Sequence, residues 1–434
     1  MREYWRFFRE EWRLLSYGIS FTFLSSFGQT FLLSLFVPFF LVEFSLTEGQ
    51  FGGLYSAATL GGALLLPWVG AWIDRMPLPR FTLGVVALMA LSAGLASRAQ
   101  GLWVLALALV GLRLSGQALS GHAAATTMAR YFARARGKAL GISSVGFPLG
   151  EAVLPLLVTG SLAVVGWRTS WVLIALAVVG LFGPILLSTI RRSGVQLDPR
   201  QLRREWDGTA PSGEAQREGG TPERLNVDGG ANGRAAESDR QWRRREVLRD
   251  TRFWFILPAA FLPPFWTTGL FLYQTSIADW KGWSIALMAS AFIPFAALRV
   301  FSALAVGPWV DRLSARRIFP FVVLPMGVGI VFLLVFQEPW AAYAYMAFMG
   351  VTNGLSANVK SAMWAELYGV QHLGSIKSMM TALMVVSTAA SPVIVGFVLE
   401  SEPGLAPLLW AAVASVAGGT LLALRILPGG AGTS

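Results

Sequence analysis

Long apolar runs dominate this 434-residue sequence and restrict it to one class of fold. About twelve runs approach the roughly 20 residues that an α-helix needs to cross the hydrocarbon core of a bilayer. They lie near 16–41, 49–73, 81–97, 102–129, 139–165, 169–190, 253–278, 284–310, 318–336, 340–365, 375–399 and 405–424. None shows the ten-residue alternation of a membrane β-strand. We therefore expect an all-α membrane protein with twelve transmembrane helices.

The composition agrees with this class and excludes several others. Hydrophobic residues make up 54% of the chain and charged residues only 14%, whereas soluble domains carry about a quarter charged residues. The net charge of +11 comes from Lys and Arg between the apolar runs, so it does not indicate a nucleic-acid partner. The chain has no cysteine, and His122 and His372 are too few for a histidine metal cluster. We expect no metal and no cofactor.

The loops differ in basic charge, which predicts the orientation in the membrane. With the N-terminus inside, the inner segments hold most Lys and Arg, and the outer ones hold only Arg98, Arg168 and Lys281. Positive loops stay in the cytoplasm. We expect a multi-pass protein of the plasma (inner) membrane with both termini cytoplasmic, in contact with the lipid bilayer and functional as a monomer.

The middle of the chain interrupts the apolar pattern. Residues 191–251 are rich in Gly, Arg and Glu and have too few apolar residues to bury a core. They predict a disordered cytoplasmic loop between a six-helix bundle at 1–190 and a second one at 252–434.

The two halves share a loop motif. GAWIDRMPLPR follows the second run and GPWVDRLSARR follows the eighth, with Gly, Trp, Asp and two Arg at the same spacing. Such a repeat indicates a duplicated six-helix unit. The charged positions in it are Asp74, Arg75 and Arg80 in the first copy and Asp311, Arg312 and Arg317 in the second.

The loop motif GxxxDRxxxxR resembles the signature of the major facilitator superfamily. This resemblance implies two pseudo-symmetric six-helix bundles, transport by alternating access, and a conformational latch formed by the six charged loop residues. GLRLSGQALSG in the fourth run resembles the superfamily's fourth-helix motif, whose buried Arg corresponds to Arg113. WAELYGVQHLGSIKS resembles the turn after helix ten in the monocarboxylate transporter and oxalate/formate antiporter branch. That branch has an essential Arg in helix eight, and here Arg299 lies one turn deeper than expected.

Four ionisable residues lie inside predicted spans, where a charge costs at least roughly 2.5–3.5 kcal/mol. They are Arg113, Glu151, Arg299 and Lys360. Their positive excess favours an anionic solute, most simply a small carboxylate held by Arg299 and Arg113, because the guanidinium fork binds carboxylates through two hydrogen bonds. In the alternative, Arg113 pairs with Glu151 and Arg299 alone binds the anion.

Other polar residues in the spans complete the predicted site. Glu151 is the first candidate for carrying a proton and His122 the second, because burial and nearby charges can shift the pKa of a carboxyl or imidazole group. The cavity-lining candidates are Gln29, Gln117, Tyr273, Gln274 and Asn353. Each of these side chains is also common in helix packing.

The resulting hypothesis is a proton-coupled secondary transporter for a small organic anion such as a monocarboxylate, and not an enzyme. A proton-antiport efflux carrier for drugs or metabolites is the alternative, because Gly146, Pro148 and Gly150 resemble a fifth-helix motif of drug–proton antiporters. The same small residues also permit close helix packing. An alternative of another class is a membrane sensor that transports nothing.

Overall fold

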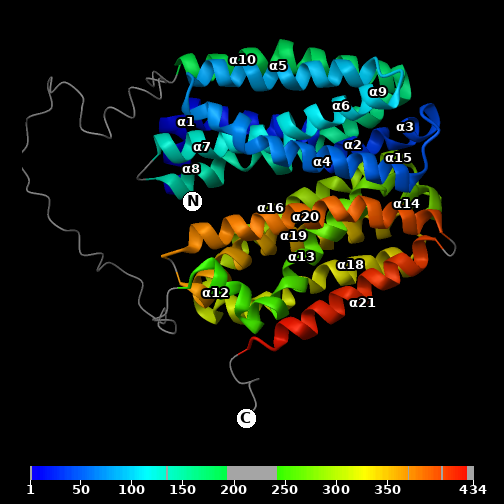
Figure 1. Ribbon diagram of the computed structural model, residues 1–434. Helices are drawn as coiled ribbons and strands as arrows, with labels where there is room; N and C mark the ends of the chain where they lie inside the picture. The colour runs from blue at the N-terminus through cyan, green and yellow to red at the C-terminus, as the bar shows by residue number, and fades with distance from the viewer. Residues whose placement is uncertain (1, 133–134, 193–241, 370, 402–403, 428–434) are drawn as a thin grey trace, which may run out of the picture.

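The chain folds into two groups of long helices that lie side by side (Figure 1). The structure is a computed structural model and describes residues 2–132, 135–192, 242–369, 371–401 and 404–427. These residues form helices and no strands, which confirms the predicted all-α class. One group comes from the first part of the chain and the other from the second part.

The first group, called the N half, contains α-helices joined by short 3-10 and π segments, both labelled η. Its elements are α1 (Arg2–Leu24), η1 (Ser25–Gly28), α2 (Thr30–Leu33), η2 (Ser34–Phe36), α3 (Val37–Glu43), α4 (Glu48–Gly70), η3 (Ala71–Asp74), α5 (Leu78–Ser97), α6 (Leu102–Leu112), η4 (Arg113–Ser120), α7 (Gly121–Tyr131), α8 (Arg136–Ser143), α9 (Gly146–Ala177), η5 (Val178–Phe182) and α10 (Gly183–Arg192).

The second group, called the C half, repeats this organisation with fewer interruptions. Its elements are α12 (Arg244–Arg249), α13 (Thr251–Leu272), α14 (Gln274–Lys281), α15 (Ile285–Ser290), α16 (Phe292–Leu313), α17 (Ala315–Ile318), η6 (Phe319–Phe321), α18 (Leu324–Val335), α19 (Trp340–Tyr368), α20 (Leu373–Glu400) and α21 (Leu405–Leu424).

The helices have the length and apolar character of membrane spans. In the described ranges, nine helices are long and apolar enough to cross a bilayer, or ten if the bent pair Trp5–Gly28 and Thr30–Glu43 is one span. One of the nine, Arg136–Arg192, has 57 residues, a length of roughly 85 Å that far exceeds the bilayer. Gly166 interrupts this segment with a φ of 73°, and the segment is long enough for two spans. The architecture is compatible with twelve spans.

The predicted central loop differs from the structure near its end. Residues 193–241 lie outside the described residues, but 244–249 form α12. Trp242 packs its ring against Tyr368 at 5.5 Å between centroids. The prediction of disorder is therefore wrong for residues 244–249, next to the packed rings of Trp242 and Tyr368.

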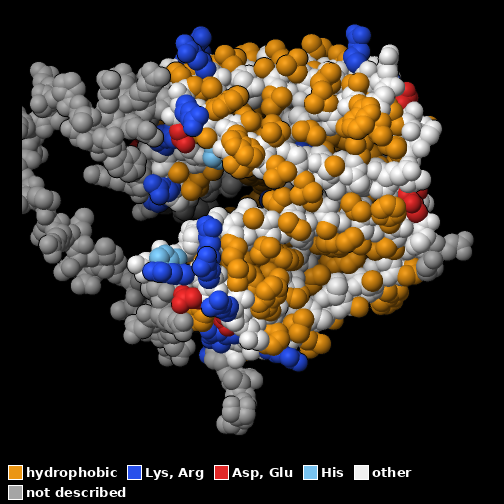
Figure 2. Space-filling model, viewed as in Figure 1, with side chains coloured by type: hydrophobic (Ala, Val, Ile, Leu, Met, Phe, Trp, Pro, Cys, Tyr) orange, Lys and Arg blue, Asp and Glu red, His pale blue; other side chains and the backbone are white. Residues whose placement is uncertain are grey.

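The two ends of the bundle differ in charge. We call the end that carries Asp74, Arg130, Arg192 and Glu366 the basic end, because Lys and Arg gather there at the left of Figure 2. The end that carries Glu48 and Glu400 is called the opposite end. Between them the surface is largely apolar (Figure 2), as a surface facing lipid must be.

Candidate functional site

A charged pair joins the two halves in the middle of the bundle. Nη1 of Arg299, on α16, donates to Oε1 of Glu151, on α9. The Glu151 side chain is 11% exposed and the Arg299 side chain 33%. The sequence left open whether Glu151 pairs with Arg113, and the structure gives it Arg299 as its partner.

Close helix crossings within each half position the helices that carry these two residues. A Cβ on Gly150 would lie 2.0 Å from Oγ of Ser26, so α9 packs directly on η1. A Cβ on Gly354 would lie 2.3 Å from the carbonyl oxygen of Arg299, so α19 packs directly on α16. Any larger side chain at either position would push the helices apart. The small residues beside Glu151 therefore serve close packing, one of the two roles that the sequence allowed.

A cavity adjoins the charged pair. It has a volume of about 160 Å³ and is lined by Ser26, Gln29, Phe31, Phe147, Glu151 and Arg299. The second carboxylate oxygen of Glu151 and the hydroxyl of Ser26 are buried and make no hydrogen bond within the described residues. The cavity thus lies between a charged pair and two aromatic side chains, a combination found in small-molecule sites.

Arg113 lies outside this cavity. It is 1% exposed, and its Nη1 donates to the carbonyl oxygen of Gly28 at 2.9 Å. Its Nε donates to Oγ1 of Thr59 at 3.0 Å, and its guanidinium lies 4.8 Å from the ring centroid of Tyr55. In this structure its contacts are with the protein itself.

Hydrogen bonds between the halves close the opposite end. Nε2 of Gln274 donates to the carbonyl oxygen of Phe31 at 3.1 Å and to Oγ of Ser34 at 2.5 Å. The hydroxyl of Tyr273 donates to the carbonyl oxygen of Glu48 at 2.8 Å. Two predicted cavity residues, Tyr273 and Gln274, thus lie in the contact that closes this end.

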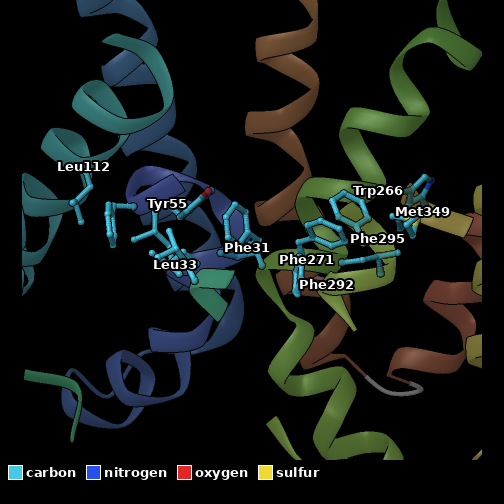
Figure 3. Packing of buried hydrophobic residues seen from close by; sticks show 14 of the residues in the cluster. Phe31, Leu33, Tyr55, Leu112, Trp266, Phe271, Phe292, Phe295 and Met349 are labelled. Carbon is cyan, nitrogen blue, oxygen red and sulfur yellow. The ribbon is translucent and has the colours of Figure 1, made fainter. Parts of the chain in front are cut away.

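Aromatic and acidic side chains extend the same contact. Phe31 points toward Phe271 and Phe292 of the C half (Figure 3), and its centroid lies 5.5 Å from that of Phe292. The hydroxyl of Ser276 donates to the Glu48 carboxylate at 2.5 Å, and the backbone N–H of Gly49 donates to the Glu400 carboxylate. We call this set of contacts the opposite-end seal.

The basic end is open between the halves. Figure 2 shows the surface hollowed there. Apart from the Arg299–Glu151 pair, the hydrogen bonds that join a described residue of one half to a described residue of the other all lie in the opposite-end seal. Among the described residues, the halves are therefore joined by hydrogen bonds at the opposite end and at the charged pair.

The predicted latch residues behave differently in the two halves. Asp74 accepts from Arg130 within the N half. When the two halves are aligned, Glu366 occupies the position equivalent to Arg130. Asp311, the equivalent of Asp74, therefore has no cation at that position. Glu366 instead accepts from the backbone N–H groups of Ala315 at 2.8 Å and Arg316 at 3.0 Å. The remaining predicted latch side chains are exposed: Arg75, Arg80, Asp311, Arg312 and Arg317.

The other predicted cavity and proton-carrying residues do not line the cavity. Nδ2 of Asn353 donates to Oγ1 of Thr267 at 3.1 Å. Gln117 is partly buried in η4, and His122 packs beside Gly70. Of the predicted site, Gln29, Glu151 and Arg299 come together.

Sequence reasoning missed several functional candidates. Ser26, Phe31 and Phe147 line the cavity, and Glu48 and Glu400 belong to the seal. Phe147 lies four residues before Glu151, which is the same face of a helix, so that signal was available. The roles of the other four residues depend on contacts between segments that are distant in sequence, so their spacing in the sequence gives no signal.

Comparison with known proteins supports the fold. Two solved structures resemble the chain over nearly its whole length. A bacterial homolog of the human lysosomal transporter Spinster is 16% identical, with a TM-score of 0.62 over 96% of this chain and 95% of that one. The nucleoside transporter NupG is 12% identical, with a TM-score of 0.64 over 96% and 98%. At these identities they show the fold alone.

A curated relative is similar in sequence over a shorter stretch. The fosmidomycin resistance protein of Escherichia coli (strain K12) is 33% identical over 173 residues. The match spans 38% of this chain and 39% of that relative. The family described as Major Facilitator Superfamily matches at residues 19–303 and 265–432. The chain is therefore a membrane transporter that belongs to the Major Facilitator Superfamily.

Proposed function

We propose that this transporter carries a small organic anion, most simply a monocarboxylate, together with a proton. The observation that supports this is the Arg299–Glu151 pair, which joins the halves beside a cavity. A guanidinium at this depth is expensive unless a negative group neutralises it. Here Glu151 does so, and a bound carboxylate has the same charge and the same planar oxygens.

The Arg299–Glu151 pair would couple the binding of an anion to the binding of a proton. If an anion binds Arg299, Glu151 has to release the guanidinium, and a free buried carboxylate is costly. A proton on Glu151 removes that charge, so anion and proton enter together and the site stays neutral. Its second oxygen has no partner in the described residues and is a place where such a proton can sit.

The cavity volume favours a small solute in this conformation. A cavity of about 150 Å³ accepts benzene, which has six heavy atoms, and the cavity here is about 160 Å³. Drug-sized ligands occupy roughly 300–1,000 Å³. The two Phe walls would contact the carbon chain of a short carboxylic acid while Arg299 binds its charge.

We propose transport by alternating access, and the contacts between the halves support it. We propose that the basic end faces the cytoplasm, as positive loops do, and that the structure represents the inward-open state. The outward-open state would require the opposite-end seal to separate and the basic end to close. The loop Asp74 and its counterpart Asp311, with their neighbouring Arg residues, are proposed to stabilise these states.

The direct test is uptake of labelled acetate, lactate and pyruvate into proteoliposomes with an inward proton gradient. Arg299→Ala is expected to reduce uptake about 10- to 100-fold, because hydrogen bonds to charged groups contribute about 1.5–3 kcal/mol. Arg98→Ala, an exposed arginine, is the matched control and is expected to transport normally. Full uptake by the Arg299 variant would refute the anion site.

Export of drugs or metabolites by proton antiport is the second candidate. The relative named for fosmidomycin resistance favours it, and the same Glu151 would carry the counter-moving proton. Cells that express the protein would then survive fosmidomycin, and Glu151→Gln would abolish that protection. Equal sensitivity of cells with and without the protein would count against this drug as a substrate.

A further inference from the structure

The first membrane span is broken beside the cavity. Gln29 has extended backbone angles, with φ −85° and ψ 155°, between η1 and α2. The helices on its two sides, Trp5–Gly28 and Thr30–Glu43, meet at 44°. A break frees backbone carbonyl groups that a continuous helix would use, and in a membrane these need other partners.

Two stacked side chains bind the two sides of this break. Arg113 donates to the carbonyl oxygen of Gly28, just before Gln29, at 2.9 Å. The hydroxyl of Tyr55 lies 2.7 Å from Oγ1 of Thr30, just after Gln29. The Arg113 guanidinium lies 4.8 Å from the Tyr55 ring centroid, a distance at which a cation and an aromatic face attract each other.

The two sides of the break are held by different contacts. A Cβ on Gly116 would lie 2.6 Å from the backbone of Gly28, so η1 and η4 are in direct backbone contact. Arg113 is in turn held by Thr59 of α4 at 3.0 Å. The segment after the break contacts both halves: Phe36 stacks on Trp171 of the N half at 4.3 Å between centroids, and Gln274 of the C half donates to Phe31 and Ser34.

Phe31 connects the cavity with the seal. Its side chain lines the cavity and contacts Phe292 (Figure 3), while its carbonyl oxygen accepts from Gln274 at 3.1 Å. A solute in the cavity therefore touches the same residue that helps to close the opposite end. Rotation about Gln29 would move Phe31 and Ser34 together.

We propose that Gln29 is a hinge through which the solute site controls the opposite-end seal, and that Arg113 and Tyr55 form a clamp that sets its resting angle. Arg113 is then a positioning residue for the hinge. Its burial at 1% exposure and its absence from the cavity wall support this role. The proposal does not depend on which solute is carried.

The test measures how often the seal opens when no solute is present. The chain has no cysteine, so Ser34→Cys introduces a single thiol at a fully buried position of the seal. A membrane-impermeant methanethiosulfonate reagent, added to each face of proteoliposomes separately, then reports seal opening as a labelling rate. All further variants are made in this Ser34→Cys background.

Tyr55→Phe keeps the ring under Arg113 and removes only the hydroxyl bound to Thr30. It is expected to speed labelling from the opposite end about three- to tenfold, because losing one neutral hydrogen bond changes the opening equilibrium by about that factor. Arg113→Lys keeps the positive charge but removes the planar guanidinium that binds Gly28 and Thr59. It is expected to speed labelling at least about tenfold. Tyr17→Phe is the matched control, because it removes a buried Tyr–Thr hydroxyl contact of 3.0 Å elsewhere in the N half.

Labelling of Tyr55→Phe and Arg113→Lys at the rate of the Ser34→Cys parent would overturn the clamp. If Arg113 acts only as an anion ligand, labelling without solute stays at the parent rate while acetate uptake falls. Because the labelling assay contains no solute, its result is independent of the anion proposal. A faster rate in Tyr17→Phe as well would show general loosening and would also refute the clamp.

Discussion

Glu151→Gln removes the group that would compete with a bound anion for Arg299. In the wild-type protein the Glu151 carboxylate occupies Nη1 of that arginine, so each anion that binds requires one proton on Glu151. Above the pH at which Glu151 loses its proton, the dissociation constant of the anion should rise by up to tenfold per pH unit, about 1.4 kcal/mol. Affinity therefore falls as pH rises.

The exposure of Arg299 limits how steeply the dissociation constant of the anion rises with pH. The Arg299 side chain is 33% exposed, and solvent weakens the coupling of a partly exposed pair. We expect the logarithm of the dissociation constant to rise by about 0.5–1 per pH unit in the wild-type protein. Glutamine cannot ionise, so the variant should bind with the same affinity at every pH.

Calorimetric titration of acetate or lactate into the purified protein, at fixed salt between about pH 5.5 and 8.5, measures this slope. Glu10→Gln, which removes an exposed carboxylate paired with Arg6, is the matched control and should keep the wild-type slope. A flat profile in the wild-type protein would refute the competition between Glu151 and the anion, as would a slope that persists in Glu151→Gln.

Two further predictions concern the ends of the bundle. Tyr273→Phe loses the hydrogen bond to the Glu48 carbonyl, which contributes about 0.5–1.5 kcal/mol. The seal should therefore open several-fold more often, as labelling of the Ser34→Cys thiol would show, and an unchanged rate would argue against Tyr273 as part of it. Asp74→Asn breaks the pair with Arg130, whereas Asp311→Asn removes an exposed carboxylate, so the first should slow exchange in proteoliposomes more than the second. Equal effects would mean that the repeated aspartates work alike despite their different contacts.

Much of the fold was predictable because the bilayer imposes strict requirements. A span must be long and apolar, and its backbone must be satisfied internally, so long apolar runs indicate helices directly. The duplicated loop motif at Asp74 and Asp311 then predicted two related halves. The end of the central loop was not predicted correctly, because α12 buries Val247 and the adjacent Trp242 packs on Tyr368, which is distant in sequence.

The site was only partly predictable. Hydropathy identifies Arg113, Glu151 and Arg299 as costly in the membrane, but it cannot say which of them meet. Whether Glu151 meets Arg113 or Arg299 depends on how the two halves pack, for example at Gly52 of α4, where an added Cβ would lie 2.2 Å from the carbonyl oxygen of Pro392 on α20. The sequence offered Arg113 as a partner of Glu151, and the pairing with Arg299 appeared only in the structure.

The sequence by itself determined that this chain spans a membrane as repeated helices and that a few buried charges matter, because lipid cannot solvate backbone groups or ions. The tertiary structure decided the partners: Glu151 with Arg299 across the halves, Arg113 with the Gly28 carbonyl, and Glu366 with the backbone N–H groups at the start of α17. Pairing is a property of distances between segments far apart in the chain, and those distances exist only after the helices pack.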